Sequence, residues 1–422
     1  AGVYLDQITA ARPCLCFDPA HPHAAGAGEA WLEQGYWPML AAIRHDLHQR
    51  YPEVILNSED AAEPYMHLLD GCLPWRFLDI GHVPAYQSIY AGRIQLTSRH
   101  YDDTSYDALF PKAAEQLLYG EQIGWFGVQC LRGTVPFAVF VKKLAHTRQA
   151  FLPFFNGGDM LKPAPFVSTV PSVTADWGFY GPRVITTPAL LHSAWRLGDS
   201  VAVLFANTSS EPVTATLAPS PAAWGLREDG VRLAEFGEGA EPVLSDWRPG
   251  QPKAVAVPGY SLAAWLVCGG DAAARIAAAT ALFASLKGVD DAAGMTPERR
   301  RSERAQRDPW IVPDTPLRSA LEWTAAATAA KLLQARTADD GSYVGWIGNS
   351  SALCFGPVDF GQADGGQAVL EYEVAVPAGA ANRRILLMEA VNGRGVLIAS
   401  GKLESTGDYR TFTVQRTPLP AG

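Results

Sequence analysis

Short apolar runs alternate with helical stretches over the first part of the chain. Strands are predicted where apolar runs are bounded by polar residues or glycine, at 2–5, 54–57, 83–90 and 122–126. Over 31–49 apolar residues recur every three or four positions, which predicts one face of a helix, and a second long helix is expected over 136–155. This alternation indicates parallel βα units, either in a doubly wound sheet or in a barrel.

The pattern changes after residue 165. Residues 166–270 contain short strands punctuated by proline, which predicts an antiparallel β-sandwich. Residues 271–315 are rich in alanine and then charged, so we expect a helix followed by a solvated linker. Residues 316–422 return to alternating strands. The chain therefore divides into three folded blocks and one linker.

The first two predicted strands are each followed by carboxylates. Neither is followed by a glycine-rich phosphate loop. Asp6 follows the first strand, and Glu59 and Asp60 follow the second. Polar residues at the carboxyl ends of successive parallel strands are where a (β/α)8 barrel carries its chemistry. We therefore expect residues 1–165 to form a partial barrel. Too few βα units are visible for a whole one, so its first strands are expected upstream.

The two carboxylates Asp6 and Glu59 suggest the hydrolysis of a glycosidic bond. Cleavage of a glycosidic bond usually needs two carboxyl groups that face each other across the sugar. Neighbouring strands lie ~5 Å apart, so Asp6 and Glu59 can reach the ~5 to 5.5 Å separation of a retaining enzyme. The same residues also fit a structural interpretation, in which Asp6 caps the next element and 57–60 starts an ordinary helix.

The amino-acid composition restricts the kinds of molecule that the protein is expected to bind. A formal net charge of −9 argues against nucleic acid, because non-specific affinity for phosphate backbones rests on Lys and Arg. No apolar run approaches the ~18 residues of a membrane span. The 12 Trp and 14 Tyr offer flat apolar faces that suit sugar rings. A carbohydrate is therefore the expected partner.

Cellular location stays open. The six cysteines are too dispersed for the disulfide framework of a small secreted domain. The chain opens at Ala1 as a strand already under way, so a signal region is expected upstream and a secreted or periplasmic protein is suspected.

Further candidates lie in loops and at expected strand ends. The histidines His21 and His23 follow Cys14 and Cys16. The one-residue gap between the cysteines is poor for zinc, because alternate side chains point apart in an extended chain. Hydrogen bonds from the two histidines to sugar hydroxyls fit better, and a loop held by bonds from histidine to backbone fits equally well.

Aromatic and amide side chains complete the expected sugar site. The candidates at strand ends are Gln87, Tyr90, Glu121 and Trp125. An aromatic platform with hydrogen-bonding neighbours would bind a sugar, although Trp125 fits a core position equally well.

Four segments resemble bacterial TIM-barrel glycosidase-like proteins that are distantly similar to endo-α-N-acetylgalactosaminidases and other α-retaining barrels. These segments are residues 2–8, residues 16–23 with Gly26 and Gly28, residues 57–64 and residues 119–125. The resemblance covers about residues 1–268. It implies that Asp6 is the nucleophile and that Glu59 is the acid/base, with Glu63 competing because it lies one helical turn further on.

The last block, 316–422, resembles family 6 carbohydrate-binding modules, which are β-jelly rolls, through residues 343–348, 355–361 and 405–412. The resemblance implies that Trp346 and Tyr409 sandwich a sugar. It also implies a structural calcium, for which Glu322 would be an early ligand. The chain stops at Gly422, where the last strand and its acidic ligand should follow, so the module is expected to be truncated. A jelly roll that binds nothing is the alternative.

Taken together, the sequence predicts part of a multidomain glycoside hydrolase that acts on an oligosaccharide, polysaccharide or glycan, needs no cofactor for catalysis, and is inactive as these 422 residues alone. One alternative is a non-catalytic carbohydrate-binding protein with a degenerate barrel. A weaker one is a metal-dependent hydrolase that uses Cys14, Cys16, His21 and His23.

Overall fold

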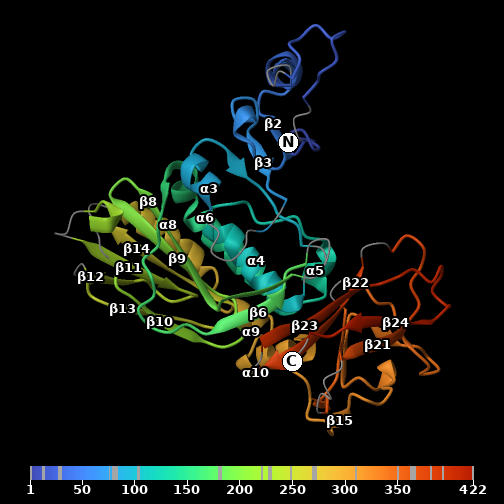
Figure 1. Cartoon of the computed structure of the whole chain (residues 1–422). Coiled ribbons are helices and arrows are strands. Elements are labelled where there is room, and N and C mark those ends of the chain that lie inside the picture. The colour runs from blue at the N-terminus through green and yellow to red at the C-terminus, as the bar shows by residue number, and fades with distance from the viewer. Residues whose placement is uncertain are drawn as a thin grey trace.

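The computed structural model has a parallel sheet near the N-terminus, a central antiparallel sheet covered by helices, and a C-terminal group of strand pairs (Figure 1). The residues it describes are 2–11, 15–26, 31–75, 77, 84–101, 105–178, 183–219, 222–226, 231–247, 250–268, 273–308, 311–348, 351–361, 367–380, 383–391 and 394–420. None of the helices in these ranges is long and apolar enough to cross a membrane.

The N-terminal sheet has four parallel strands in the order β1-β2-β3-β4. They are β1 (Gly2–Leu5), β2 (Ile55–Glu59), β3 (Gly71–Leu73) and β4 (Gln95–Leu96). A parallel bridge between Thr97 and Gln122 continues the sheet by one more segment. All four strands and the bridge run the same way, as βα units require. Within the described ranges, however, the sheet stays open and no closed barrel forms.

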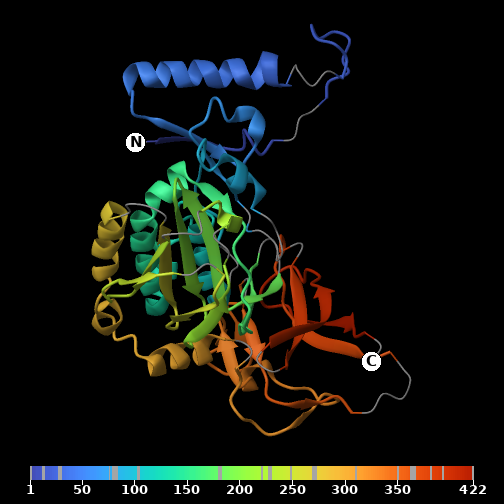
Figure 2. The same cartoon turned by 90° about the vertical axis from the view of Figure 1, so that its left-hand side faces the viewer.

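Helices and single helical turns connect these strands. They are the π-helical turn η1 (Leu32–Tyr36), α2 (Trp37–Arg50), the 3-10 turn η2 (Glu63–Tyr65) and α3 (Ala85–Tyr90). Leu40 of α2 is fully buried against Leu56 and Cys72 of the sheet, as the 3.6-residue periodicity predicts. Figure 2 shows α2 as the long blue helix that lies apart from the central block.

Two predicted strands are wrong. Residues 85–90 form helix α3, whereas Val83 lies outside the described residues. A short apolar run cannot be assigned to strand or helix by periodicity alone. Residues 122–126 contribute only the bridge at Gln122, because the chain turns into a left-handed conformation at Trp125, where φ is 50°.

The central block is a six-stranded antiparallel sheet in the order β12-β11-β14-β9-β8-β5. Its strands are β5 (Asp159–Leu161), β8 (Leu190–Leu197), β9 (Ser200–Asn207), β11 (Arg232–Gly237), β12 (Val243–Asp246) and β14 (Ser261–Cys268). Two strand pairs accompany it, β6 (Ser172–Asp176) with β7 (Val184–Pro188), and β10 (Val213–Leu217) with β13 (Lys253–Val257), as does the 3-10 turn η3 (Ala222–Trp224). Strand β5 precedes the sequence boundary expected at 165 and pairs with β8 beyond it.

Both faces of this sheet are covered. Helices α4 (Tyr106–Leu118), α5 (Val128–Arg132), α6 (Val135–Ala150) and α7 (Leu152–Gly157) precede the sheet in the chain. Leu204 of β9 faces the core that contains Phe110 of α4 and Phe140 of α6, whereas the adjacent Val203 faces the core that contains Val213 of β10. Because successive side chains of a strand point to opposite faces, a strand covered on both sides is apolar throughout.

The predicted solvated linker is wrong. Residues 273–307 form α8 (Ala273–Ala284), α9 (Val289–Ala292) and α10 (Pro297–Arg307). Thr296 caps α10 by accepting a hydrogen bond from the Arg299 amide at 3.1 Å. Arg304 reaches the buried carboxylate of Asp308 at 3.1 Å and that of Asp107 at 3.6 Å. The charged run therefore folds because its arginines pair with buried acids.

Strand pairs make up the last block. They are β15 (Arg318–Ser319) with β20 (Val358–Asp359), β16 (Lys331–Leu333) with β19 (Ala352–Cys354), β17 (Arg336–Thr337) with β18 (Val344–Gly345), β21 (Val369–Val374) with β24 (Thr413–Pro418), and β22 (Arg384–Val391) with β23 (Arg394–Lys402). A short 3-10 turn, η4 (Ala326–Thr328), separates β15 from β16. Strands are therefore the main elements here, but the described residues do not form a complete jelly roll.

Candidate functional site

Asp6 and Glu59 occupy the carboxyl ends of two paired parallel strands. The register of β1 and β2 pairs Leu5 with Ser58, so Asp6 and Glu59 are the next residues along each strand. The two side chains are close enough that Asp6 raises the pKa of Glu59. The strand register therefore places the two carboxyl groups next to each other.

The two carboxyl groups have different surroundings. Glu59 is 5% exposed, whereas Asp6 is exposed to solvent. Burial raises the pKa of Glu59, and the hydrogen bond and negative charge of Asp6 raise it further, with a smaller contribution from Asp60. The pair therefore consists of a buried carboxyl group that favours its protonated form and an exposed neighbour.

Tyr4 adds a hydroxyl group to the pair, which the sequence did not indicate. Its side chain hydrogen-bonds to Asp6. Burial, followed by the charges of Glu59 and Asp6, raises the pKa of Tyr4 to about 12. Tyr4 and Asp6 are two residues apart, so an extended strand places them on the same face.

The backbone around the pair is fixed by polar contacts. The Thr9 hydroxyl donates to the Asp60 carbonyl at 2.7 Å, and the Ser58 hydroxyl donates to the Leu5 carbonyl at 2.7 Å. Gln7 and Asp60 adopt left-handed φ values of 58° and 61° directly after their strands. Such conformations are costly for non-glycine residues and concentrate at functional sites.

Glu63 has a different partner. It lies in the 3-10 turn η2 and accepts a hydrogen bond from the hydroxyl of Tyr90 in α3. This bond raises the pKa of Tyr90. The structure thus brings together two predicted site residues, Glu63 and Tyr90, as a pair of their own.

An aromatic cluster continues the same edge of the sheet. Trp75 follows β3, His100 follows β4 and Trp125 follows the bridged segment. The ring centroids lie 5.9 Å apart for Trp75 and His100, 5.4 Å for His100 and Trp125, and 6.3 Å for Trp75 and Trp125. Trp125 remains 45% exposed. These three rings, the strand-end aromatic cluster, form a partly open aromatic surface.

Sequence reasoning found Trp125 but missed Trp75 and His100. Strands β3 and β4 are only three and two residues long, so neither produced a recognisable apolar run. The usable signal was an aromatic residue shortly after each of two short apolar segments.

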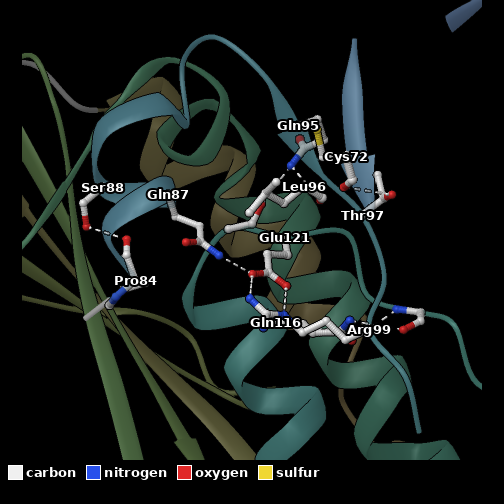
Figure 3. Close-up of polar contacts among 12 residues, drawn as sticks. Cys72, Pro84, Gln87, Ser88, Gln95, Leu96, Thr97, Arg99, Gln116 and Glu121 are labelled. Carbon is white, nitrogen blue, oxygen red and sulfur yellow. Dashed lines mark hydrogen bonds and ion pairs between the residues drawn. The ribbon is translucent and has the colours of Figure 1, made fainter. Parts of the chain in front are cut away.

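Gln87 and Glu121 lie inside the protein, where the Glu121 carboxylate accepts hydrogen bonds from both Gln87 and Arg99 (Figure 3). Arg99 and Glu121 are 1% and 0% exposed. Arg99 Nε donates to Glu121 Oε2 at 2.7 Å, and Gln87 Nε2 donates to Glu121 Oε1 at 2.5 Å. Contact of Gln87 or Glu121 with substrate stays a prediction, because in this structure their polar groups satisfy one another.

The histidines lie on the loop after β1. His21 and His23 are close to Cys16, and their ring centroids are 5.6 Å apart. Cys14 and Gly28, which entered the sequence predictions, lie outside the described residues.

The candidate sugar-binding rings of the last block are exposed. Trp346 is 56% exposed and Tyr409 is 78% exposed. The Arg336 guanidinium carbon lies 3.4 Å from the Trp346 ring centroid. Arg336 therefore covers one face of the Trp346 ring.

Comparisons with known proteins link the chain to glycosidases. A family model described as "Domain of unknown function (DUF6259)" matches residues 1–101. A Monosiga brevicollis protein named "Putative glycoside hydrolase 22789" is 31% identical over 136 residues, which cover 30% of this chain and 11% of that protein. A Bacteroides thetaiotaomicron protein named "Putative glycoside hydrolase" is 28% identical over 171 residues, which cover 38% of this chain and 25% of that protein.

Two solved structures overlap the chain in part. One is a GH27 β-L-arabinopyranosidase from Geobacillus stearothermophilus, with 8% identity, coverage of 64% of this chain and 58% of that chain, and a TM-score of 0.35. The other is an α-amylase from Geobacillus thermoleovorans, with 11% identity, coverage of 55% and 57%, and a TM-score of 0.36. TM-scores of this size do not establish a shared fold. The sequence matches do establish that the chain is distantly related to proteins named as glycoside hydrolases.

Proposed function

We propose that the chain carries the two carboxyl groups of a retaining glycoside hydrolase, with Asp6 as the nucleophile and Glu59 as the acid/base. The observation that carries this proposal is the pair of adjacent carboxyl groups at the ends of β1 and β2, one of which has a raised pKa. Two carboxyl groups in reach of one another at the carboxyl end of a parallel sheet are what the retaining mechanism uses.

The protonation states support these two roles. A general acid must hold its proton until the leaving group takes it, and the raised pKa of Glu59 favours the protonated form. The other carboxyl group, Asp6, is the solvent-exposed member of the pair and is the one that an incoming sugar can reach. Exchanging the roles would require the buried group to attack as an anion.

The reaction proceeds in two steps. A carboxylate oxygen of Asp6 bonds to the anomeric carbon as the glycosidic bond breaks, and Glu59 gives its proton to the departing oxygen. Water then attacks the glycosyl ester, Glu59 takes a proton from this water, and Asp6 is released.

The two carboxyl groups must be able to adopt the separation that the mechanism uses. A retaining enzyme needs ~5 to 5.5 Å between them. Because Asp6 is exposed, it can change rotamer, whereas the burial of Glu59 restricts its movement.

The strand-end aromatic cluster supports a carbohydrate substrate. Trp75, His100 and Trp125 lie along the same sheet edge as the carboxyl pair. Aromatic faces bind the CH groups of sugar rings, while neighbouring polar groups bind the hydroxyls. The sequence resemblance to α-retaining barrels makes α-glycosides the first substrates to examine.

Covalent trapping tests the proposal. The intact gene product that contains this chain is treated with 2-deoxy-2-fluoroglycosyl fluorides of α configuration, which slow the second step, and the labelled peptide is identified by mass spectrometry. We expect one sugar on Asp6. Hydrolysis of the parent sugars with the label on another residue would contradict the assignment, and a protein that binds sugars but neither hydrolyses nor is labelled would be the non-catalytic alternative.

The last block is proposed to bind carbohydrate through Trp346 and Tyr409. Their exposure leaves both rings accessible to a ligand, which supports this role.

A further inference from the structure

Three side chains on the loop after β1 place metal-binding atoms close together. Cys16 Sγ and one ring nitrogen each of His21 and His23 lie within 4.8 Å of one another. Cys16 Sγ and His21 Nδ1 are 3.0 Å apart. Tetrahedral ligands at zinc bond lengths are roughly 3.3 to 3.6 Å apart, so small side-chain movements would enclose an ion.

The backbone produces this convergence. The Gly26 amide donates to the Cys16 carbonyl at 2.7 Å, which closes the loop. Inside it, the His21 amide donates to the Asp18 carbonyl at 3.2 Å, which forms a turn. The sequence argument against zinc concerned the spacing of Cys14 and Cys16, whereas the folded loop joins Cys16 to the two histidines.

An oxygen atom lies near the ring of each histidine, and the one near His23 is within hydrogen-bond distance. His21 Nε2 lies 3.8 Å from Asp18 Oδ2, while Nδ1 faces Cys16. His23 Nδ1 lies 3.0 Å from the Ala24 carbonyl, which can only accept, so Nδ1 donates and the lone pair is on Nε2. A hydrogen-bonded oxygen partner such as the Ala24 carbonyl fixes the tautomer and orients the ring of a ligating histidine.

Core packing does not explain the arrangement. None of the described residues of the loop, 15–26, is buried. Leu15 and Phe17 are 55% and 68% exposed. A loop without a core gains order from a bound metal, because the binding free energy becomes folding free energy.

We propose that Cys16, His21 and His23 bind a zinc ion that fixes this loop. One thiolate and two imidazoles form a donor set suited to zinc, and three protein ligands leave the fourth position for water. The site is independent of the proposed hydrolase function, and the ion takes no part in the carboxylate chemistry.

Zinc competition tests the proposal on the full 422-residue chain. The protein is stripped with a chelator and titrated with Zn²⁺ against a chromophoric competitor. We expect one tightly bound equivalent, with affinity reduced at least about tenfold in Cys16→Ser and in His23→Gln. The matched control His45→Gln, at an exposed position of α2, should bind zinc as the parent does. Failure of the parent to bind, or equal binding by both site variants, would overturn the proposal.

A second measurement needs no variant. Alkylation of Cys16 by iodoacetamide is followed at the peptide level with and without one equivalent of Zn²⁺. Coordination should slow the reaction at least about tenfold, because the metal holds the thiolate sulfur. An unchanged rate at Cys16 would also overturn the proposal.

Discussion

Glu59 lies directly beside Asp6 because strands β1 and β2 pair in register up to Leu5 and Ser58. The proximity of the two carboxyl groups therefore follows from strand pairing, not from a flexible loop. A site built on strand ends is held more rigidly than one built on loops. This rigidity makes substitutions at the two positions informative.

Asp6→Asn should remove nearly all hydrolysis in the intact gene product, because an amide cannot form the glycosyl ester. Glu59→Gln should spare substrates with good leaving groups, which need little protonation. The measurement is kcat/KM for a series of aryl glycosides, with Asp46→Asn, at an exposed position of α2, as control. Unchanged activity of Asp6→Asn would remove the nucleophile assignment. If Glu63→Gln instead shows the leaving-group dependence, Glu63 is the acid/base.

Trp125→Ala should weaken oligosaccharide binding about tenfold and leave the melting temperature nearly unchanged, because Trp125 is 45% exposed. Binding is measured by titration calorimetry on the site variant Asp6→Asn, which prevents turnover. Trp323→Ala, at a 66% exposed tryptophan of the last block, is the matched control for ring loss. If the Trp125→Ala variant unfolds, or if it binds oligosaccharides as the parent does, Trp125 has a structural role and does not bind sugar.

Glu121→Ala should destabilise the protein by about 3 to 5 kcal/mol, because it removes the carboxylate that forms the buried ion pair with Arg99. Chemical denaturation measures this loss. Glu371→Ala breaks the exposed pair with Arg416 and should cost at most ~1 kcal/mol. A stable Glu121→Ala protein that has lost only sugar affinity would support the predicted substrate contact instead.

Glu115 should make stability depend on pH. Burial raises the pKa of Glu115 to about 8 in the folded protein. The folded state therefore holds a proton that the unfolded state releases, so the unfolding free energy falls as pH rises from about 4.5 toward 8. Glu115→Gln should flatten this dependence, measured by denaturation between about pH 5 and about pH 9. Glu53→Gln, at an exposed position, should leave the slope unchanged. A slope identical in Glu115→Gln and the parent would contradict the assignment.

Trp346→Ala should reduce oligosaccharide binding by the last block at least about tenfold without a change in melting temperature. Trp346 is more than half exposed, so its loss leaves no cavity. The measurement is a glycan-array screen and titration on the full chain. Two results would favour a purely structural role for the last block. One is that Trp346→Ala unfolds, and the other is that the well-folded variant binds glycans as the parent does.

The sequence alone determined features that depend on local order. The period of apolar residues over 31–49 predicted helix α2, and alternation of strands with helices predicted a parallel sheet that the structure confirms for β1 to β4. Asp6 and Glu59 were found because each directly follows an apolar run, so strand direction alone places both at one edge.

Only the tertiary structure decided which distant side chains meet. Glu121 and Trp125 flank the same bridged segment, yet Glu121 is fully buried against Arg99 while Trp125 is partly open. Cys16 pairs with His21 through a turn, although the sequence emphasised the neighbouring cysteine. Burial and pairing depend on how separate segments pack and on the charge each can neutralise, and neither quantity is encoded in the spacing of residues along one segment.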